Sequence, residues 1–346
     1  MVMADRPDVP TAGVLGTTRA VGTLAARLGF TIGTLGLHRP WRGPSDVWTN
    51  VAQESTREII RSFLGGALRL PTPELRSVEK LLDDLCRVVL PRFRADATTV
   101  AAGSIRDVPG LWIRPHDRPS GTILYLHGGG YLATTPAMYT VVAAELVART
   151  GCELFIADYR LAPEFPFPAG LEDAIRVFEG LLDGGVEPER LIVAGDSGGG
   201  GLATSLFEDA RAIHLPEPAG AVLLSPEVDL AMASGSIVAN AAKDVLPAEI
   251  PVLPYLGDDD PSDPRVSVVY ADLRRFPRTF VAYGSNEMFR DQIEWFAMRL
   301  RDDDVAVTDF CAPNVFHVYE ILMPWAPVSK ATFDAIDRFV DRVLPS

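Results

Sequence analysis

From about Thr99 onward the chain alternates short runs rich in Val, Ile and Leu with longer stretches of helical spacing. Five runs are apolar along almost their whole length, so we expect buried strands at GTILYLH (121–127), CELFIAD (152–158), RLIVAG (190–195), AGAVLLS (219–225) and RTFVAYG (278–284). Such strands need cover on both faces, and helices between them make the pairing parallel. The alternation therefore predicts an α/β fold on a mostly parallel sheet, with functional residues just beyond the carboxyl ends of strands.

Further strands are expected at both ends of this pattern. TVAAGS and GLWIRP are interpreted as two edge strands joined by Arg106–Pro109, and VAVTDFCA as a last strand before a closing helix at TFDAIDRFVDRVL. Residues 1–95 show helical spacing but no strand signal, and 227–267 form a polar, Pro-rich excursion. We expect these two parts to form a helical cap over the sheet, leaving 96–226 and 268–346 as the core.

The stretch LIVAGDSGGGG (191–201) places Ser197 between a buried strand and a helix, within the pattern G-x-S-x-G. In this setting the pattern predicts a nucleophile elbow, a turn so sharp that glycine is needed two residues before and after the serine. A similar GDSGG string occurs in trypsin-like proteases, but there the serine lies late in an all-β chain. A phosphate-binding turn would need a Lys in the first helical turn, and none is present.

A nucleophilic serine needs donors for a developing oxyanion and a general base. HGGG (127–130) follows the strand GTILYLH, 70 residues before Ser197. We expect the N–H groups of Gly129, Gly130 and Gly198 to form the oxyanion hole. Of the five histidines His38, His116, His127, His214 and His317, the last directly follows the final strand in a loop that can reach Ser197. His317 is therefore the candidate base, and His127 is expected to hold its own loop in place.

The motifs HGGGY (127–131), DYRLAPEFPFPA (158–169), GDSGG (195–199), LSPEVDL (224–230) and VFH (315–317) together resemble the hormone-sensitive-lipase-like (bacterial family IV) esterases and lipases. The resemblance covers about residues 110–345. It implies an α/β-hydrolase fold, with a mostly parallel eight-stranded sheet flanked by helices and a cap built partly from the N-terminal region. It also implies no cofactor and no metal.

This sequence departs from the family pattern at three places. Gly198 stands where the family usually has Ala, and Ser267-Val268 replaces the usual Ser-Pro at the return from the cap. The family's acid is commonly the first Asp of D-x-L-x-D, and here Glu287 fills that position, with Asp291 at the second. We also expect the DYRLAPEFPFPA loop to be architectural, with Arg160 pairing with Glu164.

Three loops offer a carboxylate to orient His317. Glu227 and Asp229 follow the strand AGAVLLS but open the cap excursion, where an anchoring role is expected. Asp291 lies near a helix N-terminus, where a carboxylate stabilises the helix, so its presence is explained without a catalytic role. Glu287 lies just past RTFVAYG, 30 residues before His317, so the predicted triad is Ser197, His317 and Glu287, with Asp291 as the alternative acid.

The resulting hypothesis is a carboxylic ester hydrolase that acts on short- to medium-chain acyl esters through an acyl-enzyme. An amidase or deacetylase would carry the same triad, and a non-catalytic ligand-binding homologue would keep the fold. The substrate expected is a small hydrophobic ester, and the oligomeric state, a homo-oligomer included, is left open.

Charge and composition limit the partners. The net charge of −14 argues against a nucleic-acid partner, and three scattered cysteines are too few for a disulfide framework or metal site. The default location is therefore a reducing, cytoplasmic one. No run of eighteen uncharged apolar residues occurs, so no transmembrane segment is expected. Residues 20–37 are nevertheless apolar and Gly-rich, which leaves a lipid-surface contact as the alternative to packing on the core.

Overall fold

The computed structural model describes residues 9–37, 46–90 and 97–345. Eight strands form one sheet in the order β1-β2-β4-β3-β5-β6-β7-β8. β2 runs antiparallel to β1 and β4, and the other neighbours are parallel. The strands are β1 (Thr98–Ile105), β2 (Val108–Pro115), β3 (Thr122–Leu126), β4 (Glu153–Ala157), β5 (Leu191–Asp196), β6 (Gly220–Leu224), β7 (Thr279–Gly284) and β8 (Val307–Ala312). The predicted mostly parallel, eight-stranded sheet is confirmed.

One detail of the sheet differs from the expectation. The hairpin of β1 and β2 forms as predicted, with Arg106 and Asp107 at positive φ in its turn. Of these two strands only β1 lies at an edge of the sheet, because β2 also pairs with β4. The sequence shows a hairpin but carries no signal for which of its two strands meets the rest of the sheet.

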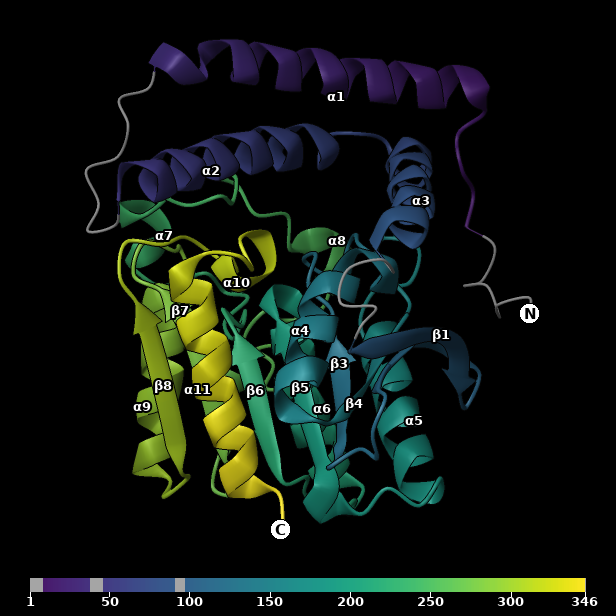
Figure 1. Cartoon of the computed structure of the whole chain (residues 1–346), viewed down its shortest axis with the longest axis vertical. Coiled ribbons are helices and arrows are strands. Elements are labelled where there is room, and N and C mark those ends of the chain that lie inside the picture. The colour runs from purple at the N-terminus through teal and green to yellow at the C-terminus, as the bar shows by residue number, and fades with distance from the viewer. Residues whose placement is uncertain (1–8, 38–45, 91–96, 346) are drawn as a thin grey trace.

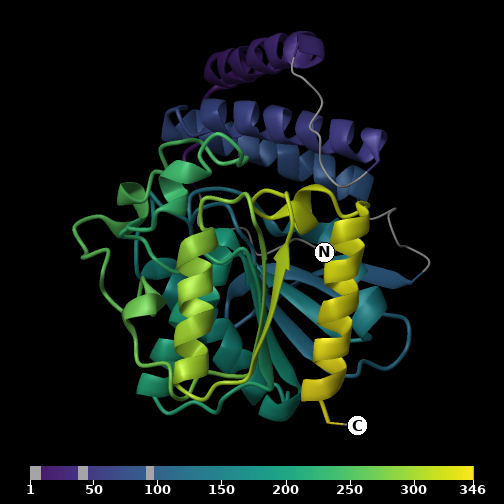
Figure 2. The same ribbon diagram turned by 90° about the vertical axis from the view of Figure 1, so that its left-hand side faces the viewer.

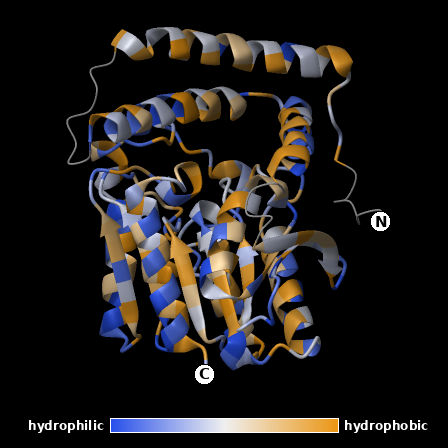
Figure 3. Cartoon of the chain, in the orientation of Figure 1, coloured by the Kyte–Doolittle hydropathy of each residue, from blue (hydrophilic) through white to orange (hydrophobic). Residues whose placement is uncertain are grey.

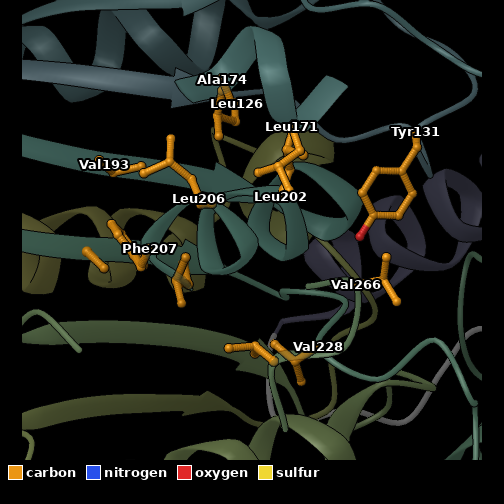
Figure 4. Packing of buried hydrophobic residues seen from close by; sticks show 14 of the residues in the cluster. Leu126, Tyr131, Leu171, Ala174, Val193, Leu202, Leu206, Phe207, Val228 and Val266 are labelled. Atoms are coloured by element: carbon orange, nitrogen blue, oxygen red, sulfur yellow. The ribbon is translucent and has the colours of Figure 1, made fainter. Parts of the chain in front are cut away.

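Helices cover both faces of the sheet. α4 (Thr140–Thr150) and α11 (Pro327–Val343) pack on one face, and α5 (Ala169–Asp183), α6 (Ser197–Ala212) and α9 (Arg290–Asp302) on the other. Figure 2 shows α9 and α11 on opposite sides of the sheet. Successive strand residues alternate between the two cores, so Leu223 belongs to one apolar cluster and Leu224 to the other. Figure 4 shows the first cluster, in which Leu126 and Val193 from the sheet lie near Leu202 and Leu206 of α6.

Five of the described helices lie above the carboxyl ends of the strands (Figure 1), at the place expected for the cap, and are called the cap here. Its helices are α1 (Val14–Thr34), α2 (Val47–Ala67), α3 (Thr72–Val89), α7 (Ser236–Ala239) and α8 (Leu253–Leu256). Short segments complete the described chain: η1 (Leu35–Leu37), η3 (Pro136–Tyr139), η4 (Pro188–Arg190), η5 (Val268–Tyr270) and α10 (Tyr319–Leu322).

A buried arginine fastens α3 to the core. The guanidinium of Arg76 donates to the carbonyl oxygens of Leu132 and Ala162, both at 2.7 Å, and pairs with Glu164 at 2.6 Å. Arg160 instead pairs with Asp173 at 2.9 Å. The expected pair between Arg160 and Glu164 is therefore wrong, because Glu164 faces the cap helix rather than its own loop.

α1 is the part of the described chain with the least packing. Four buried residues, Ala20, Leu24, Ala67 and Val78, form the small cluster that joins it to α2 and α3. Several large apolar side chains of α1 remain exposed, among them Val14, Leu15, Phe30 and Ile32, although the helix also carries polar residues (Figure 3). Residues 14–37 are long and apolar enough to cross a membrane, with a mean hydropathy of 1.3. The sequence alone predicts no transmembrane segment here, because Arg27 and four glycines interrupt the apolar stretch that begins at Ala20. A core helix of a soluble protein and a signal sequence have the same length and composition.

Candidate active site

Ser197 lies where β5 passes into α6, with a backbone φ of 51°. This left-handed conformation is costly for a residue with a side chain, and it persists only where the surroundings impose it. Two glycines permit the turn. A Cβ on Gly195 would lie 2.5 Å from the carbonyl oxygen of Gly199, and one on Gly199 would lie 2.2 Å from that of Leu126. The turn therefore has the geometry of the predicted elbow.

The structure brings the other two predicted residues to this serine. The Nε2 atom of His317 lies 2.8 Å from Ser197 Oγ, and its Nδ1 atom lies 3.3 Å from Oε2 of Glu287. Glu287 follows β7 and His317 follows β8, so neighbouring parallel strands deliver both side chains to the same edge of the sheet. All three side chains are buried.

Burial dominates the electrostatics of this trio. It lowers the pKa of His317, although the nearby Asp244 and Asp196 carboxylates act in the opposite direction. It raises the pKa of Glu287 well above its usual range, and the charge of Asp244 adds to that rise. A neutral imidazole at neutral pH is the form that can accept the serine proton.

Asp244 is not identified from the sequence, yet this residue joins the loop that carries Glu287 to the loop that carries His317. Its Oδ2 accepts the N–H of Met288 at 2.6 Å, and its Oδ1 accepts the N–H of His317 at 3.0 Å and that of Val245 at 2.7 Å. The residue lies in the cap excursion, where nothing in its sequence surroundings distinguishes it from a solvated loop acid.

The other candidate acids lie away from His317. The carboxylate of Asp291 accepts the N–H of Ser236 at 2.8 Å and pairs with Arg290, so it anchors α7. Asp229 accepts the N–H of Ala231 at 3.0 Å within the start of the excursion. Glu227 lines the cavity next to Ser197 but makes no contact with the imidazole.

The HGGG loop follows β3 beside the elbow. Gly129 and Gly130 have φ of 113° and 60°, and a Cβ on Gly129 would lie 2.1 Å from the carbonyl oxygen of Ala133. No described residue accepts a hydrogen bond from the N–H of either glycine. Gly198 lies in the first turn of α6, where an N–H has no acceptor within the helix. All three predicted donors are thus available around Ser197.

The buried carboxylate of Asp196 supports this loop from behind. It accepts the N–H of Gly128 at 2.8 Å and the hydroxyls of Tyr125 and Tyr139 at 3.0 and 3.1 Å. Burial raises the pKa of Asp196 to about 6. His127 also belongs to the loop's scaffold, because its ring stacks on Tyr159 with centroids 4.5 Å apart.

The remaining predicted positions take no part in the site. His116 and His214 do not line the cavity, and His38 lies outside the described residues. Among the residues that the structure describes, no group of three or more His, Cys, Asp or Glu side chains could hold a metal ion.

Ser197 and His317 open into a cavity of about 290 Å³. Its walls come from α2 and α3, from the cap segment 245–252 and from the HGGG loop. They are mostly apolar, with Phe63, Leu64, Leu75, Leu246 and Phe289 among the lining residues. Such a cavity fits an uncharged, hydrophobic molecule held against the serine.

Comparison with known proteins supports the same conclusion. A model of the alpha/beta hydrolase fold family matches residues 123–321. An acetyl-hydrolase of Streptomyces hygroscopicus is 32% identical over 78% of this chain and 97% of its own length, and an esterase of Acinetobacter venetianus is 29% identical over 81% and 94%. A hormone-sensitive lipase from a metagenome library shares 30% identity over 84% of this chain and 98% of its own, with a TM-score of 0.74.

The chain therefore belongs to the alpha/beta hydrolase family, in its hormone-sensitive-lipase-like branch. Within that family it is a serine carboxylesterase or lipase, a hydrolase of carboxylic esters. The alternative of a non-catalytic binding protein finds no support among these relatives.

Proposed function

We propose that the protein hydrolyses short- to medium-chain acyl esters through the triad Ser197, His317 and Glu287. The observation that carries this proposal is the 2.8 Å approach of Ser197 Oγ to His317 Nε2 inside an apolar cavity. A nucleophile, a base and an orienting carboxylate in this order are what acyl transfer from an ester requires.

In the proposed mechanism, Ser197 Oγ attacks the ester carbonyl while His317 Nε2 takes its proton. The N–H groups of Gly129, Gly130 and Gly198 stabilise the oxyanion, each such donor being worth about 3 kcal/mol. The protonated His317 then gives its proton to the leaving alkoxide, which departs as the alcohol. Water attacks the acyl-enzyme with His317 as base, and the acid and Ser197 are released.

Glu287 acts on His317 in both steps. Its carboxylate accepts the Nδ1–H, which keeps Nε2 free to accept the serine proton and stabilises the imidazolium. Its neighbour Asp244 is occupied by three backbone N–H groups, which leaves Glu287 as the acid for this role.

The proposed limit on acyl length rests on the size of the cavity. α2, α3 and segment 245–252 bound a space of about 290 Å³, at the small end of ordinary ligand sites. An ester panel from acetyl to palmitoyl p-nitrophenyl tests it, and we expect kcat/KM to peak at short to medium chains. One related structure, 28% identical, was soaked with p-nitrophenyl butyrate, which makes this ester a suitable reference. A steady rise to palmitate would contradict the proposal.

The role of Ser197 is tested by Ser197→Ala, which fits the elbow without added bulk. We expect hydrolysis of p-nitrophenyl butyrate to fall about a million-fold, as for a triad serine in subtilisin, with unchanged unfolding. A fluorophosphonate should label wild-type protein at Ser197 alone. Retained turnover in the variant would refute the mechanism.

A second candidate is removal of an acetyl group from an amide rather than an ester, and the similarity to an acetyl-hydrolase supports an acetyl group as the acyl part of either substrate. Matched acetyl esters and acetyl anilides separate the two, since an amidase must protonate a poorer leaving group. A contact of residues 20–37 with a lipid surface also remains a proposal. Sedimentation of the protein with lipid vesicles tests this contact. Separately, we expect the protein not to bind nucleic acid.

A further inference from the structure

Three buried polar groups lie together on one side of the active-site region. They are the carboxyl of Glu227 and the hydroxyls of Tyr131 and Tyr255, whose residues are only 2%, 4% and 3% exposed. The two tyrosine rings stack with centroids 3.8 Å apart, and Glu227 lies near enough to both hydroxyls that a charge on its carboxyl would raise their pKa values. Glu227 and Tyr131 line the cavity that contains Ser197.

None of these three side chains has a hydrogen-bond partner among the described residues, and none of their polar atoms is among the fully enclosed atoms without a partner, so each keeps some access to solvent. Other buried acids around the cavity are paired, since Asp196 accepts three hydrogen bonds and Glu79 pairs with Arg76. A polar group that lacks a protein partner but is not fully enclosed is available to hydrogen-bond a bound molecule.

The backbone brings this cluster close to the nucleophile. The N–H of Glu227 donates to the carbonyl oxygen of Ser197 at 3.0 Å, which holds the start of the cap excursion against the elbow. Gly201 makes room for the cluster, because a Cβ there would lie 2.3 Å from the Tyr131 hydroxyl and 2.3 Å from the Glu227 carbonyl oxygen. In Figure 4 the Tyr131 ring points inward, with its hydroxyl on the side of Val266.

We propose that Glu227 and Tyr131, backed by Tyr255, form a polar subsite for an uncharged hydroxyl or amide group carried by the ester substrate. The inference rests on the proposed hydrolysis at Ser197 and specifies the substrate class. Glu227 is thus a specificity-determining residue, and the natural ester has a hydrogen-bonding group beyond the ester itself.

The charge of the cavity selects this class. Its described lining contains the acids Glu79, Asp196 and Glu227 but no Lys or Arg, which disfavours an anionic group. Burial raises the pKa of Glu227 to about 8, which favours the neutral carboxylic acid, a group that both donates and accepts. An ammonium group would instead require the carboxylate, and both ions would lose their hydration.

A plain alkyl ester would expel water from this subsite and leave its groups unpaired. A site built to hydrogen-bond a substrate group rejects the analogue that lacks it. We therefore expect a preference of at least about five-fold in kcat/KM for a hydroxylated ester over its alkyl analogue, which is the factor that one hydrogen bond of about 1 kcal/mol supplies.

Three matched substrate pairs test the inference on the intact chain. p-Nitrophenyl 3-hydroxybutyrate against p-nitrophenyl butyrate examines the acyl arm, and glyceryl monobutyrate against propyl butyrate examines the alcohol arm. Butyrylcholine against 3,3-dimethylbutyl butyrate asks whether a cation is preferred. We expect the hydroxylated ester to be preferred in at least one of the first two pairs and no preference in the third.

Variants assign the preference to the subsite. Glu227→Leu should abolish it by improving the alkyl ester and weakening the hydroxylated one, whereas Glu227→Gln, which keeps a donor and an acceptor, should retain it. Glu320→Leu is the matched control, because Glu320 is equally buried and its carboxyl oxygens have no partner in the described structure, but it does not line the cavity. It should leave the substrate ratios unchanged. Tyr131→Phe gives a second reading if Glu227→Leu does not fold.

Equal rates within the first two pairs in wild-type protein, or a preference that survives both Glu227→Leu and Tyr131→Phe, would overturn the inference. So would a preference for butyrylcholine that is lost in Glu227→Leu, because it would identify a cation subsite. Failure of the proposed function looks different: no ester of any pair would be hydrolysed, and the fluorophosphonate would not label Ser197.

Discussion

Exchanging one oxygen of Glu287 for an amide nitrogen, in Glu287→Gln, tests the triad most directly. The wild-type carboxylate lies 3.3 Å from Nδ1 of His317 and is fully buried. A Gln side chain can donate its amide N–H to Nδ1, which places the imidazole proton on Nε2, where it faces Ser197. We expect kcat to fall about 10³–10⁴-fold, as for the equivalent Asp→Asn change in a chymotrypsin-type triad.

The structure explains why this loss should not be rescued. A 10⁴-fold decrease corresponds to about 5.5 kcal/mol of lost transition-state stabilisation, which is the contribution asked of one buried carboxylate beside an imidazolium. Asp196 and Asp244 are also near His317, but Asp196 already accepts three hydrogen bonds. The oxygens of Asp244 already accept the N–H groups of Val245, Met288 and His317. It therefore cannot turn toward Nδ1 without breaking both loops.

Asp291→Asn is the matched control for this variant. Asp291 anchors α7 through Ser236, so its loss should cost about 1 kcal/mol of unfolding free energy and little of kcat. Initial rates with p-nitrophenyl butyrate give kcat and KM, and urea unfolding gives stability. If Asp291→Asn lost more kcat than Glu287→Gln, the acid would be Asp291 and the reasoning from the 3.3 Å contact would be refuted.

Three further outcomes follow from the site. Gly129→Ala should lower kcat by at least about 10²-fold, the effect of one lost oxyanion donor, because its Cβ would lie 2.1 Å from a backbone oxygen. In the same assay Gly198→Ala should lower kcat far less, because the nearest atom to its Cβ would lie 3.1 Å away. Asp244→Asn should lower kcat more than KM and slow fluorophosphonate labelling, because both triad loops lose a shared acceptor; unchanged labelling would contradict this. The acid limb of kcat/KM should have its midpoint below the ordinary histidine value of 6.5, because burial lowers the pKa of His317 and protonation removes the base; a midpoint above 6.5 would show that the neighbouring carboxylates outweigh burial.

The sequence predicts those features of the site that are fixed by the local geometry of the backbone and by strand order. The elbow at Ser197 was recognisable because its turn excludes side chains at Gly195 and Gly199, a requirement that any chain making this turn must meet. The position of His317 followed from strand order, since parallel strands end at one edge.

Features that depend on distant partners were not predictable in the same way. Asp244 gains its importance from loops 44 and 73 residues away, and no short pattern encodes such contacts. The mistaken pairing of Glu164 has the same origin, because its partner Arg76 arrives on a helix 88 residues earlier in the chain. In both cases the sequence identifies the charged residues, but it does not predict which distant residues the cap brings into contact with them.

The attachment of Asp244 also limits how the cap can be exchanged. A cap can be regarded as an interchangeable module that sets specificity while the catalytic core below it stays constant. Here the inserted segment supplies the acceptor that holds the loops of both Glu287 and His317, so it is not a separable part. A chimera that receives a foreign segment between β6 and β7 would inherit a nucleophile without its fixed base. Recombination at these two strand ends therefore yields active progeny only when an equivalent acceptor travels with the insert.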